Sequence, residues 1–241
     1  VLTGEEVLVE SSNIGIFLAA QRIDVEALHE IVRAFGFGRR TGSGLPGEQP
    51  GLVNPLRRWN HYSQSSVPMG QEIAVTALQM TRAFCTLATD GAMPTPTIRA
   101  VNEQAASYAV IREKVLPVGV AEHTRRILRR VVVEGTGRKA DSELYTIFGK
   151  TGTAQLPDFE NGGYHQDRYV SSFVGGAPTR TPRLVVGCFI REPDKKIGHY
   201  GGIVAGPAVQ RTLEQSLLYL EVPPTTDASD AAEAGLAHAQ P

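Results

Sequence analysis

Residues 144–153 read LYTIFGKTGT, and this stretch decides the fold. The apolar run Leu144–Phe148 leads directly into the polar run Gly149–Thr153, which predicts a β-strand that ends in chemically useful side chains. Two more strands are predicted over Tyr169–Val174 and Leu184–Ile190, with Gly and Pro turn signals between them. Because the connections are short, successive strands are expected to pair antiparallel.

Helices are predicted on both sides of these strands in the sequence. Apolar residues recur every three or four positions over Gln71–Thr89 and Ala121–Glu134, and again from Pro207 to Leu220. Helices before and after an antiparallel sheet indicate an α+β fold in which the sheet is packed between helices.

The domain organisation follows from composition along the chain. Residues 36–70 are rich in Gly, Pro, Ser and Asn, so a long irregular segment of the kind that compact domains keep for function is expected there. Residues 1–221 are expected to belong to one domain. Residues 222–241 are rich in Pro, Thr, Asp and Ala and are expected to form a disordered tail.

Charge and composition exclude several classes of function. The 241-residue chain has a formal net charge of -1 and no basic stripe, so nucleic acid is not an expected partner. Its six histidines show no metal-ligand spacing, and Cys85 and Cys188 lie in apolar runs typical of buried, inert thiols. No apolar run approaches the ~18 residues of a membrane span.

Two short motifs carry the chemistry, and each is weak when taken alone. Ser11-Ser12-Asn13 precedes an apolar helical run, where such a triplet is usually a helix cap or a turn. Lys150-Thr151-Gly152-Thr153 lies on the predicted strand, where such a run is usually a surface strand end. In this order, the pair matches the motif set of penicillin-binding proteins and serine β-lactamases.

The residue types fit acyl transfer from a peptide that ends in a carboxylate. This reaction needs a nucleophile, a base, an oxyanion hole and a cationic slot rich in hydroxyl groups. Lys150 supplies a positive charge, and Thr151 and Thr153 supply hydroxyl donors. Gly152 leaves room where a substrate backbone must approach, and the Thr153 backbone N–H can donate to a developing oxyanion.

The resemblance extends well beyond the two motifs. From about Ser11 to Leu220 the chain resembles a class B high-molecular-weight penicillin-binding protein. The segments that carry this resemblance are Phe35–Gly38, Leu45–Glu48, Met69–Gln71, Asp90-Gly91, Ser172–Pro178 and Gly201–Pro207. The resemblance implies the penicillin-binding/serine β-lactamase-like transpeptidase fold, incomplete at its N-terminus, and a D,D-transpeptidase that crosslinks peptidoglycan stem peptides.

The resemblance also implies catalytic roles. Ser11 would relay the proton between nucleophile and leaving amine, and Asn13 would bind the amide of the acyl donor. Lys150 would hold the hydrogen-bond network to Ser11 and supply positive potential.

Substrate-binding roles are implied in the same way. Thr151, Gly152 and Thr153 would form the slot for the terminal carboxylate of a D-Ala-D-Ala stem. Tyr169 and Tyr200 resemble aromatic wall positions beside the cleft, although ordinary strand packing explains these tyrosines equally well.

One motif of the family is missing from the chain. The nucleophile and its base are supplied by Ser-x-x-Lys, and no Ser here is followed by Lys three residues later. We expect this motif upstream, so the present chain alone is expected to lack acyl-enzyme activity.

Two alternatives stay open at this point. A serine β-lactamase or β-lactam sensor domain would use the same scaffold, but the sequence lacks the Glu-x-x-Leu-Asn pattern often used for deacylation, and the long separation of Asn13 from Lys150 favours the larger transpeptidase. A non-catalytic module that binds wall peptide or divisome partners is supported only by the missing Ser-x-x-Lys.

The remaining implications concern partners and location. The resemblance implies no metal or organic cofactor, binding of β-lactam antibiotics, and a membrane glycosyltransferase as partner of the full-length protein. It places that protein on the outer, periplasmic face of the cytoplasmic membrane, anchored by an N-terminal helix absent from this chain.

Overall fold

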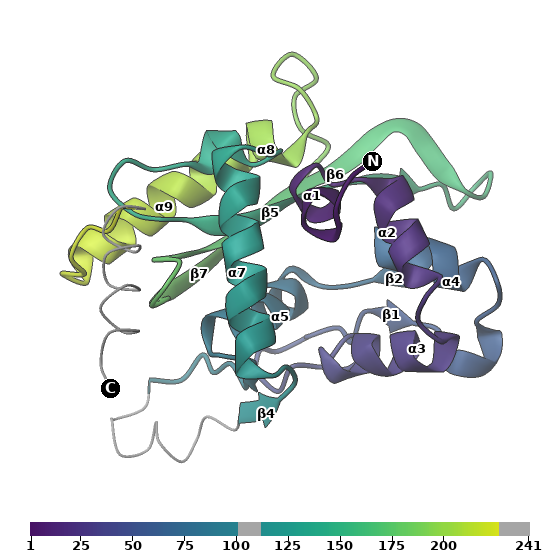
Figure 1. The fold of residues 1–241 in the computed structure, drawn as a ribbon. Coiled ribbons are helices and arrows are strands. Elements are labelled where there is room, and N and C mark those ends of the chain that lie inside the picture. The colour runs from purple at the N-terminus through teal and green to yellow at the C-terminus, as the bar shows by residue number, and fades with distance from the viewer. Residues whose placement is uncertain (101–111, 227–241) are drawn as a thin grey trace. The chain divides into compact units, whose positions relative to one another are not determined.

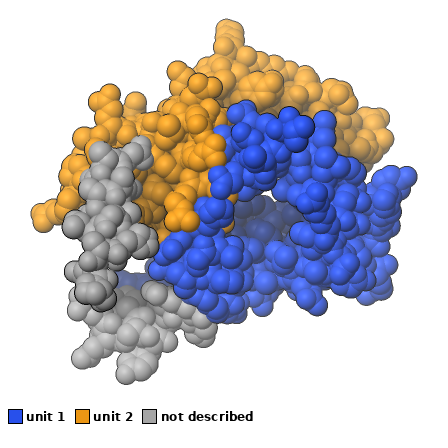
Figure 2. Space-filling model, in the orientation of Figure 1, with its two compact units in different colours: residues 1–123 blue, residues 124–241 orange. Residues whose placement is uncertain are grey.

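The computed structural model describes residues 1–100 and 112–226. The chain divides into two compact units, residues 1–123 and 124–241 (Figure 2). The boundary falls inside helix α7 (Val118–Val133), so one continuous helix belongs partly to each unit (Figure 1).

The first unit combines helices with two small antiparallel sheets. One sheet pairs β1 (Leu52–Val53) with β2 (Ile73–Ala74), and the other pairs β3 (Ala92–Pro94) with β4 (Arg112–Lys114). The helices are α1 (Gly4–Val9), α2 (Asn13–Ala20), α3 (Val25–Ala34), α4 (Ser63–Ser66) and α5 (Ala77–Ala88), with 3-10 turns at Leu56–Arg58 and Val67–Met69.

Helix α5 confirms the predicted helix but begins later than predicted. Thr76 and Gln79 form a capping box, in which the backbone N–H of Gln79 donates to Thr76 Oγ1 (3.1 Å) and the backbone N–H of Thr76 donates to Gln79 Oε1 (2.8 Å). This box fixes the first helical residue at Ala77. The predicted start at Gln71 was wrong because residues 73–74 pair as strand β2 instead.

The irregular segment before α5 is held by side chains. Buried Gln79 donates from Nε2 to the carbonyls of Arg39 (2.7 Å) and Pro50 (2.8 Å). Glu48 accepts from the Thr41 N–H (2.7 Å) and from Ser43 Oγ (3.3 Å), and these bonds lower the pKa of its carboxyl group. Residues 39–50 therefore have a defined path without regular secondary structure.

The second unit is built on a three-stranded antiparallel sheet in the order β5-β6-β7 (Figure 1). The strands are β5 (Phe148–Pro157), β6 (Tyr164–Ala177) and β7 (Leu184–Arg191). A 3-10 turn at Arg138–Ala140 follows α7, and helices α8 (Gly201–Val204) and α9 (Gly206–Tyr219) follow the sheet. The predicted antiparallel pairing and α+β class are confirmed.

Helix α9 supplies one side of the core of this unit. Its buried residues Val209, Leu213 and Leu217 belong to a cluster with side chains of β6 and of the segment that leads into β5. The other fully buried or nearly buried members are Val132, Ala140, Tyr145, Ile147, Phe173, Ala177, Ala205 and Val222.

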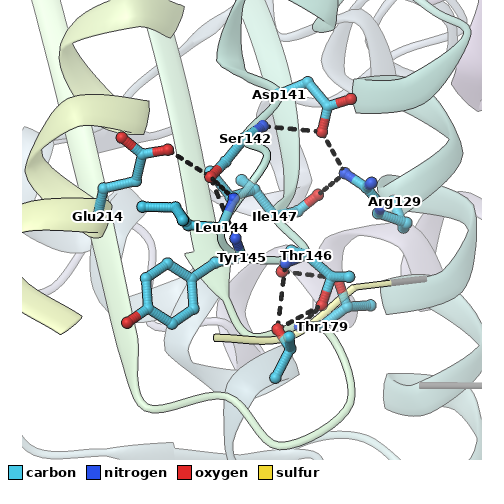
Figure 3. A network of polar contacts seen from close by, with 10 residues as sticks. Arg129, Asp141, Ser142, Leu144, Tyr145, Thr146, Ile147, Thr179 and Glu214 are labelled. Atoms are coloured by element: carbon cyan, nitrogen blue, oxygen red, sulfur yellow. Dashed lines mark hydrogen bonds and ion pairs between the residues drawn. The ribbon is translucent and has the colours of Figure 1, made fainter. Parts of the chain in front are cut away.

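The segment that leads into β5 is fixed by side-chain hydrogen bonds (Figure 3). Ser142 Oγ accepts from the backbone N–H groups of Leu144 and Tyr145 (3.1 Å each) and donates to Glu214 on α9. Thr146 accepts two hydrogen bonds of 3.1 Å from Thr179, one at its Oγ1 from the Thr179 N–H and one at its carbonyl from Thr179 Oγ1. The strand predicted to include Leu144 therefore begins only at Phe148, because these backbone groups bond to side chains rather than to a neighbouring strand.

The first residues of the predicted tail belong to this core. The Tyr145 hydroxyl donates to the carbonyl of buried Val222 (2.7 Å), and the Thr225 N–H donates to the Leu144 carbonyl (2.9 Å). The disordered tail predicted from residue 222 therefore does not include Val222–Thr225, which have defined contacts. Residues 227–241 lie outside the described residues.

Replacement of Leu213 by Ala tests the importance of the α9 contact. Leu213 is 0% exposed, so its truncation leaves a cavity and is expected to lower the free energy of unfolding by about 2–5 kcal/mol. Leu218→Ala, on the same helix but 51% exposed, is the matched control and should change stability by less than about 0.5 kcal/mol. Urea unfolding followed by circular dichroism measures both, and equal effects would contradict this packing.

Candidate active site

The polar run Lys150–Thr153 lies in the middle of strand β5. It pairs with residues 171–174 of β6, with Lys150 opposite Val174 and Thr153 opposite Ser171. Among the described residues, β5 pairs with no strand on its other side, so it is an edge strand of this sheet. Its position confirms the predicted strand location and leaves one edge for other contacts.

Lys150 is a partly buried cation at the point where β5 leaves the core. Its Nζ donates to the carbonyl of Thr151 (3.2 Å) and to Thr151 Oγ1 (3.3 Å). Burial lowers the pKa of its amine to about 8. Lys150 is therefore still mostly protonated at neutral pH and places positive charge beside the Thr151 hydroxyl.

A second hydroxyl group, missed in the sequence, joins Lys150 and Thr151. Thr136 Oγ1 lies 2.8 Å from Thr151 Oγ1 and comes from the turn between α7 and β5. Thr136 stands between Gly135 and Gly137, which reads as an ordinary turn, so no local signal points to it. The result is a cluster of one ammonium and two hydroxyl groups suited to bind an anion.

Thr153 is exposed and makes a different contact. Its Oγ1 accepts a hydrogen bond of 3.2 Å from the Gly201 N–H at the start of α8. Since a hydroxyl group both donates and accepts, the Thr153 proton is still available for a ligand. Gly152 lies between the two threonines, and a Cβ there would lie 2.5 Å from Ser172 Oγ, so a side chain at this position would require Ser172 to move.

The two predicted wall tyrosines belong to a stack of three rings. Tyr169 stacks on His199 at 4.4 Å with an interplanar angle of 15°, and His199 lies 4.4 Å from Tyr200 at 35°. The Tyr169 hydroxyl donates to the Gln166 carbonyl (2.8 Å), whereas the Tyr200 side chain is largely exposed. Tyr169 thus packs against the ring of His199, which lies in a loop. The role of both tyrosines in binding stays a prediction.

A cavity of about 550 Å³ lies beside this stack. Two ion pairs line it, Arg168 with Glu192 (2.8 and 3.1 Å) and Lys195 with Asp167 (2.6 Å). None of the residues Lys150–Thr153 lines it, and its charged side chains are already paired. It is therefore distinct from the cluster of Lys150, Thr151 and Thr136.

Ser11, Ser12 and Asn13 lie in the first unit, at the junction of α1 and α2. Ser12 is the N-cap of α2, and its Oγ accepts from the Gly15 N–H (3.1 Å). Ser11 has a positive φ of 54°, and Ser11 and Asn13 are both exposed. The capping role therefore belongs to Ser12, and proximity of Ser11 and Asn13 to Lys150 of the second unit stays a prediction.

The described residues offer little support for other chemistries. Within residues 1–100 and 112–226, no group of three or more His, Cys, Asp or Glu side chains could hold a metal ion. Burial raises the pKa of Cys85 to about 11 and also raises that of Cys188, so neither thiol is poised as a nucleophile. No helix in these ranges is long and apolar enough to cross a membrane.

The sequence matches a known protein family. The family described as "Penicillin binding protein transpeptidase domain" matches residues 1–214. The chain belongs to this family. The predicted class B penicillin-binding protein transpeptidase domain is thereby confirmed.

Individual relatives agree with the assignment. The chain is 35% identical to penicillin-binding protein PbpB of Mycolicibacterium smegmatis, over 90% of this chain and 36% of that protein. It is 34% identical to stage V sporulation protein D of Bacillus subtilis, over 91% of this chain and 34% of that protein. The chain thus spans about a third of the length of these relatives.

Solved structures show the same fold. The transpeptidase domain of penicillin-binding protein 3 from Burkholderia pseudomallei has a TM-score of 0.85 at 32% identity, covering 93% of this chain and 66% of that one. Penicillin-binding protein 3 of Mycobacterium tuberculosis in complex with ampicillin has a TM-score of 0.82 at 32% identity, covering 92% of this chain and 52% of that one.

The lowered pKa of Lys150 predicts how anion binding depends on pH. Lys150 is charged below about pH 8 and neutral above it, so affinity for a peptide that ends in a carboxylate should fall as pH rises through that value. Calorimetric titration between pH 6.5 and 9.5 measures this affinity. A peptide whose terminus is amidated is the matched control and should show no such fall. Equal pH profiles for the two peptides would contradict the assignment of Lys150 to the carboxylate slot.

Proposed function

We propose that the full-length protein is a serine D,D-transpeptidase that crosslinks peptidoglycan stem peptides. The observation that carries this proposal is the array of Lys150, Thr151 and Thr153 on edge strand β5 of a chain in the transpeptidase family. A relative from Neisseria meningitidis, 31% identical over 94% of this chain, is named a probable peptidoglycan D,D-transpeptidase.

The β5 array would bind the end of the donor peptide. Its terminal D-Ala carboxylate accepts from the hydroxyl groups of Thr151 and Thr153, and the Lys150 charge stabilises it electrostatically. The adjacent scissile carbonyl would then lie beside the Thr153 backbone N–H, which donates to the oxyanion that forms there. In this arrangement one strand binds both the carboxylate of the substrate and the negative charge that develops on its scissile carbonyl.

The reaction proceeds through two acyl transfers. The serine of a Ser-x-x-Lys segment upstream of this chain attacks the scissile carbonyl, and D-alanine leaves with a proton on its amine. The amine of a second stem peptide then attacks the acyl-enzyme, releases the serine and forms the crosslink. Ser11 would relay the proton in both steps, and Asn13 would hold the donor amide.

The proposal includes the setting of the full-length protein. It would act at the periplasmic face of the cytoplasmic membrane, anchored by an N-terminal helix, with a glycosyltransferase as its partner. It would also be acylated by β-lactams, in line with the ampicillin complex of the Mycobacterium tuberculosis relative.

A labelled penicillin tests the proposal in the full-length protein. Penicillin should form one covalent adduct per molecule that persists for many minutes, because a transpeptidase deacylates slowly. Lys150→Ala should slow adduct formation about 100-fold or more, since it removes the charge beside the carboxylate slot. Lys195→Ala is the matched control, because Lys195 pairs with Asp167 at the surface.

Each contrary result points to one of the alternatives. Rapid turnover of the chromogenic β-lactam nitrocefin, without a stable adduct, would indicate a β-lactamase. Absence of any adduct would favour the non-catalytic binding module. Equal labelling of Lys150→Ala and wild type would remove the β5 array from the mechanism. The present chain without Ser-x-x-Lys should form no adduct.

A further inference from the structure

Two hydroxyl groups on neighbouring strands hold one loop segment of the second unit. We propose that Ser171 and Thr153 form a clasp that positions Tyr200 beside the β5 array, and this rests on the function proposed above. The two residues lie directly opposite each other in the β5–β6 register. Ser171 Oγ donates to the His199 carbonyl, and Thr153 Oγ1 accepts from the Gly201 N–H (3.2 Å). We call this pair the hydroxyl clasp.

The hydroxyl clasp brackets Tyr200 along the backbone. One bond ends on the residue before Tyr200 and the other on the residue after it. The side chain between them is 60% exposed, so the backbone is fixed while the ring projects from the surface. The adjacent His199 ring is held by its stack on Tyr169 of β6.

Close backbone packing adds to the hydroxyl clasp. A Cβ on Gly201 would lie 2.1 Å from the Ser172 carbonyl oxygen and 2.4 Å from that of Gly152. Gly201 therefore sits directly on the backbones of both β5 and β6, a position that only glycine fits. The segment 199–201 is thus tied to the same two strands by two hydrogen bonds and by direct contact.

The two members of the hydroxyl clasp have different access to a ligand. Thr153 is exposed, and because it accepts from Gly201 its own proton can be donated outward to a carboxylate. Ser171 is fully buried, so its side chain is not accessible to a ligand. It is a positioning residue, which acts only through the His199 carbonyl and the Tyr200 backbone.

Loss of the Ser171 hydroxyl group should therefore affect recognition rather than chemistry. In Ser171→Ala the His199 carbonyl loses its donor, and segment 199–201 is held on one side only. The dissociation constant of the initial, non-covalent penicillin complex should rise about tenfold, the size expected for one lost buried hydrogen bond. The rate constant of the acylation step should change less than about twofold, because neither the nucleophile nor the β5 array is altered.

Stopped-flow acylation of the full-length protein by labelled penicillin separates these two constants. Ser171→Ala should raise the dissociation constant alone. The same substitution in a Tyr200→Ala background should have little further effect, because both changes weaken the same contact, that of Tyr200 with the ligand. Thr212→Ala, which deletes an exposed hydroxyl group on α9, is the matched control and should change neither constant. Effects that add fully, or a fall in the acylation rate constant alone, would overturn the proposal.

Hydrogen exchange tests the hydroxyl clasp without reference to acylation. Amides of the segment around Gly201 should exchange about tenfold faster in Ser171→Ala than in wild type or Thr212→Ala. Unchanged exchange would overturn the clasp itself, whereas failure of the wild type to react with penicillin would overturn only the proposed function. Ser171→Cys fills the site with a somewhat larger thiol group that is a much weaker donor, so it should give the same pattern if Ser171→Ala does not fold.

Discussion

The register between β5 and β6 is the constraint on which the rest of the site depends. It sets Thr153 opposite Ser171 and brings the Phe173 ring over Gly149, where a Cβ would lie 2.5 Å from a ring atom. A slip of one residue would turn every β5 side chain to the opposite face of the sheet and place a side chain where only glycine fits. The buried ring therefore holds the polar run in place.

The same strand changes from core to surface over a few residues. Phe148 is fully buried, Lys150 is partly buried, and Thr153 is exposed. This gradient explains why the Lys150 amine has a lowered pKa and yet keeps hydrogen-bond partners at Thr151. A cation held at the end of a hydrophobic strand interacts more strongly with an anion than one in bulk water, because the surrounding dielectric constant is lower.

Sequence patterns predicted the regular elements and the strand that carries Lys150, because periodicity and turn residues are local signals. They misplaced the starts of α5 and β5. The first residue of α5 is set by a capping box at Thr76, and the start of β5 is set by side-chain hydrogen bonds such as those of Thr146. Thr136 and Ser171 were missed because their partners are distant in the chain, at Thr151 and His199. The roles of Ser11 and Asn13 came from family resemblance alone, since one motif in each unit cannot establish a shared site.

We propose that the lysine-threonine run on β5 receives the ligand carboxylate while Ser11 and Asn13 contact the same ligand. A crystal structure of the full-length protein acylated by ampicillin tests this most directly. We expect the ampicillin carboxylate to lie within hydrogen-bond distance of the Thr151 and Thr153 hydroxyl groups, with Asn13 bonded to the side-chain amide of the drug. A carboxylate bound away from β5, or Asn13 on a face remote from Lys150, would contradict it.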